Sequence, residues 1–327
     1  MMNLNSIPIF FLLLQSQATR TFASNQSAAP ASQYKKSFDN RKTITREQAK
    51  SVYNKFALSG HIAGRDASSG YGGPAVRSLM ALADFGVWCD PTSSSDMEED
   101  EQPDEHADTT TRKDNDANVQ ESSRGIQRVF DYGCGQGKLA ERVFHAISSS
   151  PQQHSNIHWH GVDQSPEMIA KFQQRLEPCN HKSNFHFSSE LMKDGNPNQL
   201  LNTTPAKYYH RFVSTYCLDL LSEEDMHSVL SLAEHCLHPN GKLILAGITY
   251  GYKDSFKTFW MTLAWEIMYR IRPDVVGGCR PQRLRPYLEE MGWRVEDEIR
   301  TLPVGFPWMV SEVICATRGR SISEEVD

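Results

Sequence analysis

The sequence has 327 residues, of which 39% are hydrophobic, and a net charge of −6 at neutral pH. This allows one large domain or two small ones with a sizeable core. The seven cysteines include no C-x-x-C pair, which argues against a disulfide framework or a zinc module and fits a reducing compartment.

The first 44 residues do not have the pattern of a folded domain. Residues 7–14 are a short apolar run, far below the ~20 residues that a membrane span needs, so we expect no stable membrane insertion. No acid precedes Asp39, whereas Arg20, Lys35 and Lys36 are basic, as is typical of an organellar presequence. Residues 20–24 resemble a mitochondrial cleavage site. We favour a mitochondrial destination, with plastid targeting, secretion or a disordered tail as alternatives.

Two helices are expected between residues 45 and 89. Thr45 can cap a helix that runs from residue 46 to about residue 56, and Pro74 can open a second one that runs to about residue 85. The stretch between them contains His61 and Tyr71, which are polar or aromatic candidates for a catalytic role; surface or packing roles are the alternative.

Residues 90–125 form an acidic segment. From Asp90 to Arg124 there are twelve acids and three bases, with almost no aromatic or branched apolar residues. Such a composition cannot bury enough surface to fold, so we expect a disordered insert. A solvated loop is its simplest interpretation, and a docking or regulatory segment is the alternative. The acidity belongs to this segment and says little about the partners of the fold.

A glycine-rich turn follows the first expected strand, residues 127–132. It has the form acid-x-G-x-G-x-G, made by Asp131, Gly133, Gly135 and Gly137. A dinucleotide site needs G-x-G-x-x-G, but the sixth position holds Lys138. A P-loop needs Ser or Thr after the lysine, and leucine follows here. The turn therefore disfavours an NAD(P) oxidoreductase and a P-loop enzyme.

This turn resembles the first motif of the class I S-adenosylmethionine (SAM) dependent methyltransferases. A second expected strand, residues 157–162, leads into Asp163 and a helix that begins at Ser165-Pro166. In the resembled family this acid binds the ribose hydroxyls of SAM. The resemblance implies an α/β fold, a doubly wound, mostly parallel, seven-stranded Rossmann-like sheet with N-terminal lid helices. The cofactor residues that it implies are Asp131, Gly133, Cys134, Gly135, Gly137, Asp163, Gln164, Met168, Ser214 and Thr215.

The segments after the second strand bear on the adenine contact and on the methyl-transfer region. A third strand is expected at residues 184–187, and the family's acid after it has only Glu190 or Asp194 as counterparts. The fourth, residues 211–214, runs into Thr215 and Tyr216, a form similar to small-molecule, quinone-methyltransferase-like enzymes. Tyr216 is a catalytic candidate or a hydrogen-bonded wall of the crevice. Asp219 is interpreted as a solvent-facing loop acid.

The remaining segments complete the expected domain, residues 126–318, with a tail at 319–327. We expect a helix to about residue 237, strands at 242–248, 293–299 and 310–317, and a short helix at 284–291. A substrate cap is expected at about 250–290. Its apolar helical stripe is interpreted as core or as a pocket wall that includes Trp260. Arg280 either binds an acidic or phenolate group of the substrate or has a structural role.

Together these features predict a SAM-dependent methyltransferase that acts on a small, apolar or aromatic molecule by in-line displacement. If the acceptor must lose a proton, His61, Tyr71 or Tyr216 would be the base. The alternative is a degenerate methyltransferase fold that serves as a binding or adaptor protein. We expect no metal, because the paired His158 and His160 have no third ligand, and no nucleic-acid partner. The oligomeric state is left open.

Overall fold

The computed structural model describes residues 44–59, 74–85, 126–148, 156–179, 185–252, 255–302 and 308–319. The predicted presequence and acidic insert lie outside these ranges, as do His61 and Tyr71. The assignment of those segments, and the domain boundaries drawn from them, stay predictions.

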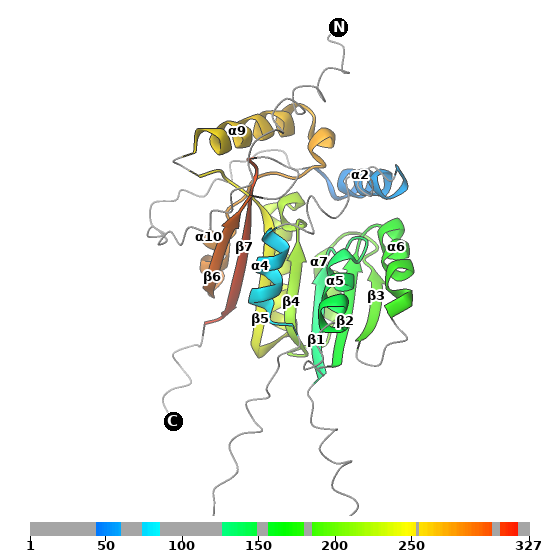
Figure 1. Ribbon diagram of the computed structural model, residues 1–327. Coiled ribbons are helices and arrows are strands. Elements are labelled where there is room, and N and C mark those ends of the chain that lie inside the picture. Colours follow the sequence, from blue (N-terminus) through cyan, green and yellow to red (C-terminus); the bar gives the residue numbers. More distant parts are fainter. Residues whose placement is uncertain are drawn as a thin grey trace, which may run out of the picture.

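The centre of the fold is a seven-stranded sheet with the order β3-β2-β1-β4-β5-β7-β6 (Figure 1). Strands β1 to β5 pair in parallel, whereas β7 runs antiparallel to both β5 and β6. The predicted doubly wound, mostly parallel sheet is therefore confirmed. The strands are β1 (Ile126–Tyr132), β2 (Asn156–Asp163), β3 (Phe185–Leu191), β4 (Tyr209–Thr215), β5 (Leu237–Thr249), β6 (Trp293–Thr301) and β7 (Val310–Arg318).

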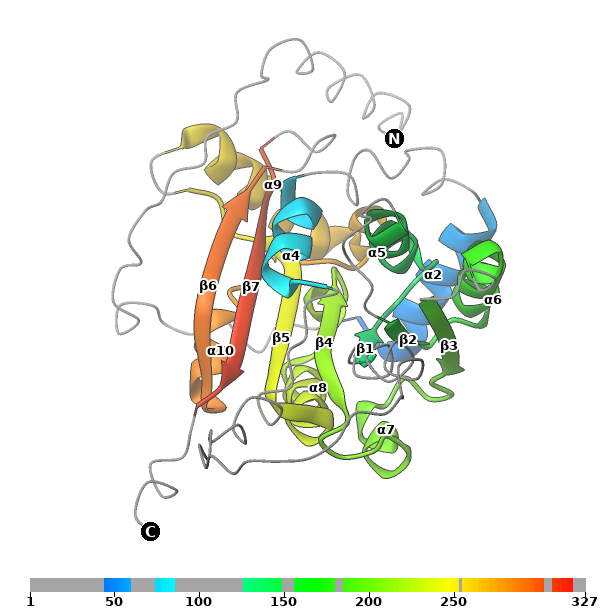
Figure 2. The same cartoon turned by 60° about the horizontal axis from the view of Figure 1, so that its bottom comes forward.

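Helices cover both faces of the sheet. One core lies between the sheet and α4, α5 and α6, and includes Val143, Trp159 and Phe172. The other lies between the sheet and α7, α8 and α10, and includes Phe212 and Leu230. Figure 2 shows the sheet between these layers. The helices are α2 (Arg46–Ser59), α4 (Pro74–Ala83), α5 (Lys138–Ser148), α6 (Pro166–Leu176), α7 (Pro197–Thr203), α8 (Glu223–Cys236), α9 (Phe256–Ile271) and α10 (Arg285–Glu290).

The two N-terminal helices take different positions. Helix α4 packs on β5 and β7, with Val76 and Leu79 fully buried in the sheet core. Helix α2 packs against α6, and Asn54 accepts a 2.6 Å hydrogen bond from the hydroxyl of Ser165, just beyond the carboxyl end of β2. Only α2 therefore lies where a lid over the strand ends is expected, and α4 is a sheet-face helix.

Two strands are longer than predicted, and one helix was not predicted. Strand β3 extends to Leu191, because Ser188 to Leu191 pair with β2 although the run is polar. Strand β5 begins at Leu237 rather than at residue 242, and its pairing with β4 shifts register between Tyr209 and Arg211. The seven-residue helix α7 was not predicted. In each case neighbouring strands or helices determine the local structure more than the local sequence does.

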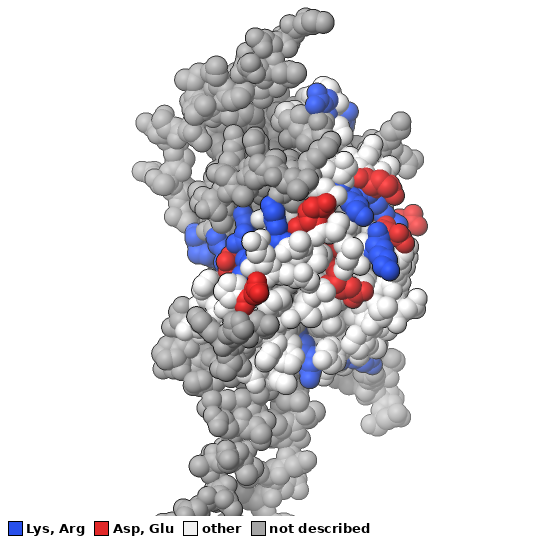
Figure 3. Space-filling model, turned by 90° about the vertical axis from the view of Figure 1, so that its right-hand side faces the viewer, with Lys and Arg blue, Asp and Glu red and all other residues white. Residues whose placement is uncertain are grey.

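The surface seen from the side of α6 and β3 has charges of both signs. Figure 3 shows Lys and Arg side chains interspersed with Asp and Glu side chains on this face. None of the helices in the described ranges combines the length and the apolar character that crossing a membrane requires.

Candidate functional site

The glycine turn joins the carboxyl end of β1 to α5 and has left-handed backbone angles at Gly133, Gly135 and Gly137, with φ of 72°, 54° and 73°. A Cβ at Gly133 would lie 2.5 Å from the Cys217 sulfur, and one at Gly137 would lie 2.9 Å from the Phe172 ring. A Cβ at Gly135 would meet no atom within 4 Å. Two glycines therefore permit close packing, and the middle one faces open space in which a ligand can touch the main chain.

Asp163 lies beside this turn at the end of β2. Its Oδ2 accepts a 3.0 Å hydrogen bond from the Gly135 backbone N–H, and its Oδ1 accepts one of 2.8 Å from the Ser165 backbone N–H. Burial raises the pKa of Asp163 to about 6, although these N–H groups oppose the shift. Gln164 is partly exposed next to it, and the side chain of Met168 is buried in the first turn of α6.

Asp131 is a buried acid at the end of β1, directly before the turn. Its Oδ2 accepts a 3.1 Å hydrogen bond from the Trp159 indole N–H, and its Oδ1 has no hydrogen-bond partner among the described residues. Burial raises its pKa to about 7, and the nearby Asp163 adds to the shift. A buried carboxylate oxygen without a partner is costly, so this atom is suited to a polar or cationic ligand.

The end of β4 lies beside the glycine turn. The Ser214 hydroxyl donates to the Tyr132 carbonyl over 2.9 Å, and Thr215 is buried. Tyr216 has a strained φ of 52°, and its hydroxyl lies 2.9 Å from the Ser311 hydroxyl. Burial raises the pKa of Tyr216 to about 12, so its hydroxyl is a poor base near neutral pH. The geometry fits a hydrogen-bonded wall better than a catalytic base.

Asp219 is the residue that the sequence interpretation placed wrongly. It is buried rather than solvent-facing, in a short 3-10 turn (Leu218–Leu220) after β4. Its Oδ2 accepts a long, 3.4 Å hydrogen bond from the Ile248 backbone N–H, and its Oδ1 has no partner among the described residues. Burial raises its pKa to about 7. The Tyr53 hydroxyl and the Cys217 and Cys279 thiols lie close enough for its charge to act on them.

Arg280 and Tyr53 also lie close to Asp219. The Arg280 guanidinium donates to the Leu221 carbonyl over 2.7 Å, its backbone N–H donates to the Asp219 carbonyl over 3.1 Å, and burial lowers its pKa. These contacts favour the structural alternative for Arg280. Tyr53, on α2, places its hydroxyl 3.8 Å from the Cys279 sulfur, so α2 also reaches the loop that carries Arg280.

The cap helix α9 has the reverse orientation to the one expected from its apolar stripe. Trp265 and Tyr269 are buried, whereas five members of the stripe are exposed: Phe256, Phe259, Trp260, Ile267 and Ile271. The interpretation of these five as core is wrong. The Trp260 ring stacks edge-on with those of Phe256 and Phe259 on the outer side of the helix, away from Asp219 and Arg280. A substrate contact through Trp260 stays a prediction.

The two acids considered for the adenine each have one polar contact in the structure, and their role toward the adenine stays a prediction. Glu190, in β3, forms a 3.6 Å ion pair with His160, and Asp194 accepts a 2.7 Å hydrogen bond from the Gln199 amide. His158 and His160 contact β3, and the described residues contain no group of three potential metal ligands.

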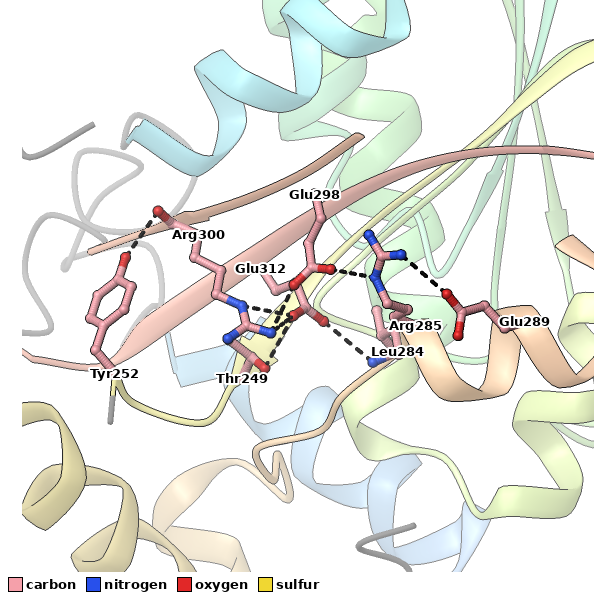
Figure 4. A network of polar contacts seen from close by, with 8 residues as sticks. All are labelled: Thr249, Tyr252, Leu284, Arg285, Glu289, Glu298, Arg300 and Glu312. Atoms are coloured by element: carbon pink, nitrogen blue, oxygen red, sulfur yellow. Dashed lines mark hydrogen bonds and ion pairs between the residues drawn. The ribbon is translucent and has the colours of Figure 1, made fainter. Parts of the chain in front are cut away.

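A second buried polar cluster lies at the end of β5 (Figure 4). Glu312 accepts hydrogen bonds from Arg300 and from the Leu284 backbone N–H, at 3.2 and 3.3 Å. Glu298 bridges Arg300 and Arg285 with two contacts of 2.7 Å. Because both oxygens of each glutamate are engaged, the cluster joins β6, β7 and α10 structurally and does not offer a free group to a ligand.

Comparison with known proteins identifies one family. Residues 125–272 match a family model described as a methyltransferase domain. No curated protein matches the sequence.

Solved structures of similar fold include a magnesium protoporphyrin IX methyltransferase (ChlM) from Synechocystis PCC 6803 with bound SAM. It is 17% identical, with 62% of this chain and 74% of that chain covered and a TM-score of 0.38. The [4+2]-cyclase SpnF is 14% identical, over 61% and 78% of the two chains, with a TM-score of 0.42. The mitomycin 7-O-methyltransferase MmcR is 18% identical, over 60% and 50%, with a TM-score of 0.41. Likenesses this distant carry no information about the substrate.

Proposed function

Because residues 125–272 form a class I SAM-dependent methyltransferase domain, we propose that the chain transfers the methyl group of SAM to a small, apolar or aromatic acceptor by in-line displacement. The observation that carries this proposal is the arrangement around Gly135. Its backbone faces open space, its N–H is held by Asp163, and the unpartnered Asp131 Oδ1 is buried just before the turn. A Cβ at this position would enter the space that the cofactor needs.

The residues present fit the cofactor. Asp163 would accept the ribose hydroxyls, and the backbone of Gly133 to Gly137 would lie against the amino-acid part of SAM. Asp131 adds negative charge near a ligand that is positively charged. SAM supplies a methyl group that is already activated on a positive sulfur. The protein therefore has to orient the acceptor and exclude water, which can contribute ~7–11 kcal/mol in favourable cases.

The acceptor site that we propose is the region around Asp219. The surrounding groups are weakly polar or aromatic: Tyr53 from the lid helix α2, Tyr216 from the end of β4, and the thiols of Cys217 and Cys279. A site with apolar walls and a few convergent polar groups suits a small aromatic or otherwise apolar molecule. This agrees with the substrate class expected from the sequence.

Asp219 also fits the role of a base better than Tyr216 does. In its ionised form, Asp219 would accept the proton that an acceptor hydroxyl loses on methylation. Its pKa of about 7 lies near physiological pH, where general bases are most effective, whereas that of Tyr216 is about 12. His61 and Tyr71, outside the described residues, remain alternative candidates.

The test is methyl transfer from labelled SAM to a panel of phenols and quinols, followed by mass spectrometry of the products. With an acceptor found, Asp219→Asn should lower kcat about a hundredfold or more while the affinity for SAM changes little. Asp297→Asn, a matched change at an exposed position of the edge strand β6, should leave kcat unchanged. An unchanged kcat in Asp219→Asn would exclude the base role. SAM binding without transfer to any acceptor would favour the non-catalytic binding protein.

A further inference from the structure

Helix α9 has an inner and an outer face of different composition. The inner face bears Trp265 and Tyr269, which pack with Val276 and Met309 in a small core of their own. The Trp265 indole N–H donates to the Cys279 carbonyl over 2.9 Å, next to Arg280. The inner face therefore fixes α9 to the loop that closes the Asp219 region.

The outer face is apolar and exposed. Phe256, Phe259, Trp260, Ile267 and Ile271 are 76%, 55%, 49%, 47% and 71% exposed. They are five of the eight large hydrophobic side chains that are exposed in the described part of the chain. At about 100° per residue, their positions fall within an arc of about 120° on one side of the helix. Clustering of this kind marks an interaction surface, because isolated exposed apolar residues would be scattered over the protein.

Basic residues flank this outer face. At about 100° per residue, Lys257 falls just outside one edge of the apolar arc, and Arg270 falls inside the arc near its other edge, beside Phe259. Both are exposed, as is Arg272 directly after the helix, whereas the only acid of α9 is the half-buried Glu266. Long basic side chains beside a Trp- and Phe-containing apolar face are typical of a helix that lies in the interface of a bilayer, with its basic groups reaching the lipid phosphates.

We propose that the outer face of α9 docks the protein reversibly onto an anionic lipid bilayer. The helix would lie in the headgroup region rather than cross the membrane. A second copy of this chain fits the same face less well. In an antiparallel pairing centred on Leu263 and Ala264, Lys257 of each copy would face Arg270 of the other, and like charges would repel. An anionic bilayer instead complements both edges of the face.

The position of α9 gives this docking a consequence for the reaction. The helix follows the carboxyl end of β5, and its inner face contacts the loop beside the proposed acceptor site. Figure 1 shows α9 and α2 at the same end of the sheet. Docking would hold the acceptor site close to the lipid, where an apolar acceptor accumulates. This consequence rests on the proposed function, whereas the docking itself does not.

The docking is tested by flotation of the full chain with vesicles of mixed phosphatidylcholine and phosphatidylglycerol, beside vesicles of phosphatidylcholine alone. We expect wild type to float with the anionic vesicles. The triple variant Phe256→Ser, Trp260→Ser and Ile267→Ser should bind at least about tenfold more weakly. Lys257→Gln combined with Arg270→Gln should weaken binding by about tenfold or more and reduce its salt dependence.

The matched control replaces exposed apolar residues elsewhere, with Leu191→Ser and Tyr208→Ser, and should bind as wild type does. Circular dichroism and the unfolding temperature show that each variant is folded, without reference to SAM. The triple variant keeps residues 1–43. If that segment were responsible for vesicle binding, the triple variant would therefore bind vesicles as strongly as wild type does. That equality, or wild type that fails to float, would overturn the proposal. If wild type does not bind vesicles but forms a dimer in sedimentation, and the triple variant does not, the outer face of α9 binds a second copy of this chain instead.

Discussion

Asp163 holds the backbone N–H of Gly135 through a 3.0 Å hydrogen bond, which ties the end of β2 to the middle of the glycine turn. The same carboxylate holds the Ser165 N–H at the start of α6. One side chain therefore fixes two backbone segments that border the open space at Gly135. The site proposed for the cofactor therefore depends on these two hydrogen bonds. Substitutions here should change the affinity for SAM and the free energy of unfolding by different amounts.

The glycines of the turn should respond differently to substitution. Gly135→Ala places a methyl group in open space at a strained φ, so we expect a loss of ~1–2 kcal/mol in stability and a large loss of SAM affinity. Gly137→Ala adds a clash with Phe172 and should cost about 2–4 kcal/mol. Chemical denaturation and SAM titration measure the two effects. Equal stability losses in the two variants, or full SAM affinity in Gly135→Ala, would contradict the proposal that SAM occupies the open space at Gly135.

The affinity for SAM should increase with pH. The pKa of Asp163 is raised to about 6 and that of Asp131 to about 7, so both acids are partly protonated in mildly acidic solution. The ionised forms are the better acceptors and attract a cation, so binding should release protons. We expect affinity to rise about tenfold between pH 5 and 8. Calorimetry in buffers of different ionisation heat measures the proton release; a pH-independent affinity would contradict this prediction. Asp163→Asn should flatten the pH dependence.

Asp219→Asn should stabilise the protein at alkaline pH. Because the folded pKa of about 7 lies above the ordinary value of 3.8, the folded state binds the proton more tightly than the unfolded state does. The resulting destabilisation is absent below about pH 4, grows as pH rises, and is complete above about pH 7. The variant, which cannot ionise, should therefore unfold at higher denaturant concentration than wild type at pH 8 but not at pH 4. A variant less stable than wild type at pH 8 would indicate that the ionised carboxylate stabilises the fold.

Arg300→Ala should destabilise the fold strongly, because it leaves Glu312 buried without its cation (Figure 4). We expect a loss of about 2 kcal/mol or more at pH 8. Burial already raises the pKa of Glu312 to about 7, and removal of Arg300 raises it further, so the loss should be smaller at pH 5, where Glu312 is protonated. The control Arg294→Ala removes an exposed ion pair with Glu296 and should cost less than about 1 kcal/mol at either pH. Equal losses in the two variants would contradict the structural role of the cluster.

The sequence predicted the fold more completely than the site. Strands β1 and β2 are marked by the acid or glycine turn at their carboxyl ends, and β4 by the short run Phe212-Val213 before Ser214-Thr215, so their positions could be predicted to within two residues. Strand β3 could not, since Ser188 to Glu190 are polar and become a strand through pairing with β2. The glycine turn was predictable because its backbone angles need glycine. The burial of Asp219 was not, because it comes from contacts with β5 and the Arg280 loop, both distant in the chain.

Helix α9 shows a second limit of the sequence pattern. Its apolar spacing predicts a helix correctly, but the pattern does not say which face meets the protein. Trp265 and Tyr269 are buried because Trp265 donates to the Cys279 carbonyl and both pack on Val276 and Met309. Periodicity alone favours burial of the larger apolar stripe. Its exposure is therefore information that only the structure supplies.

Calorimetric titration tests most directly whether the glycine turn and Asp163 bind SAM. SAM titrated into the full chain should bind with micromolar affinity, about 8 kcal/mol, and Asp163→Ala should lose most of this binding. Asp297→Ala, the same change at an exposed site on β6, should bind as wild type does. Absence of binding heat and of a thermal shift in folded wild type, or equal affinity in Asp163→Ala, would contradict the account.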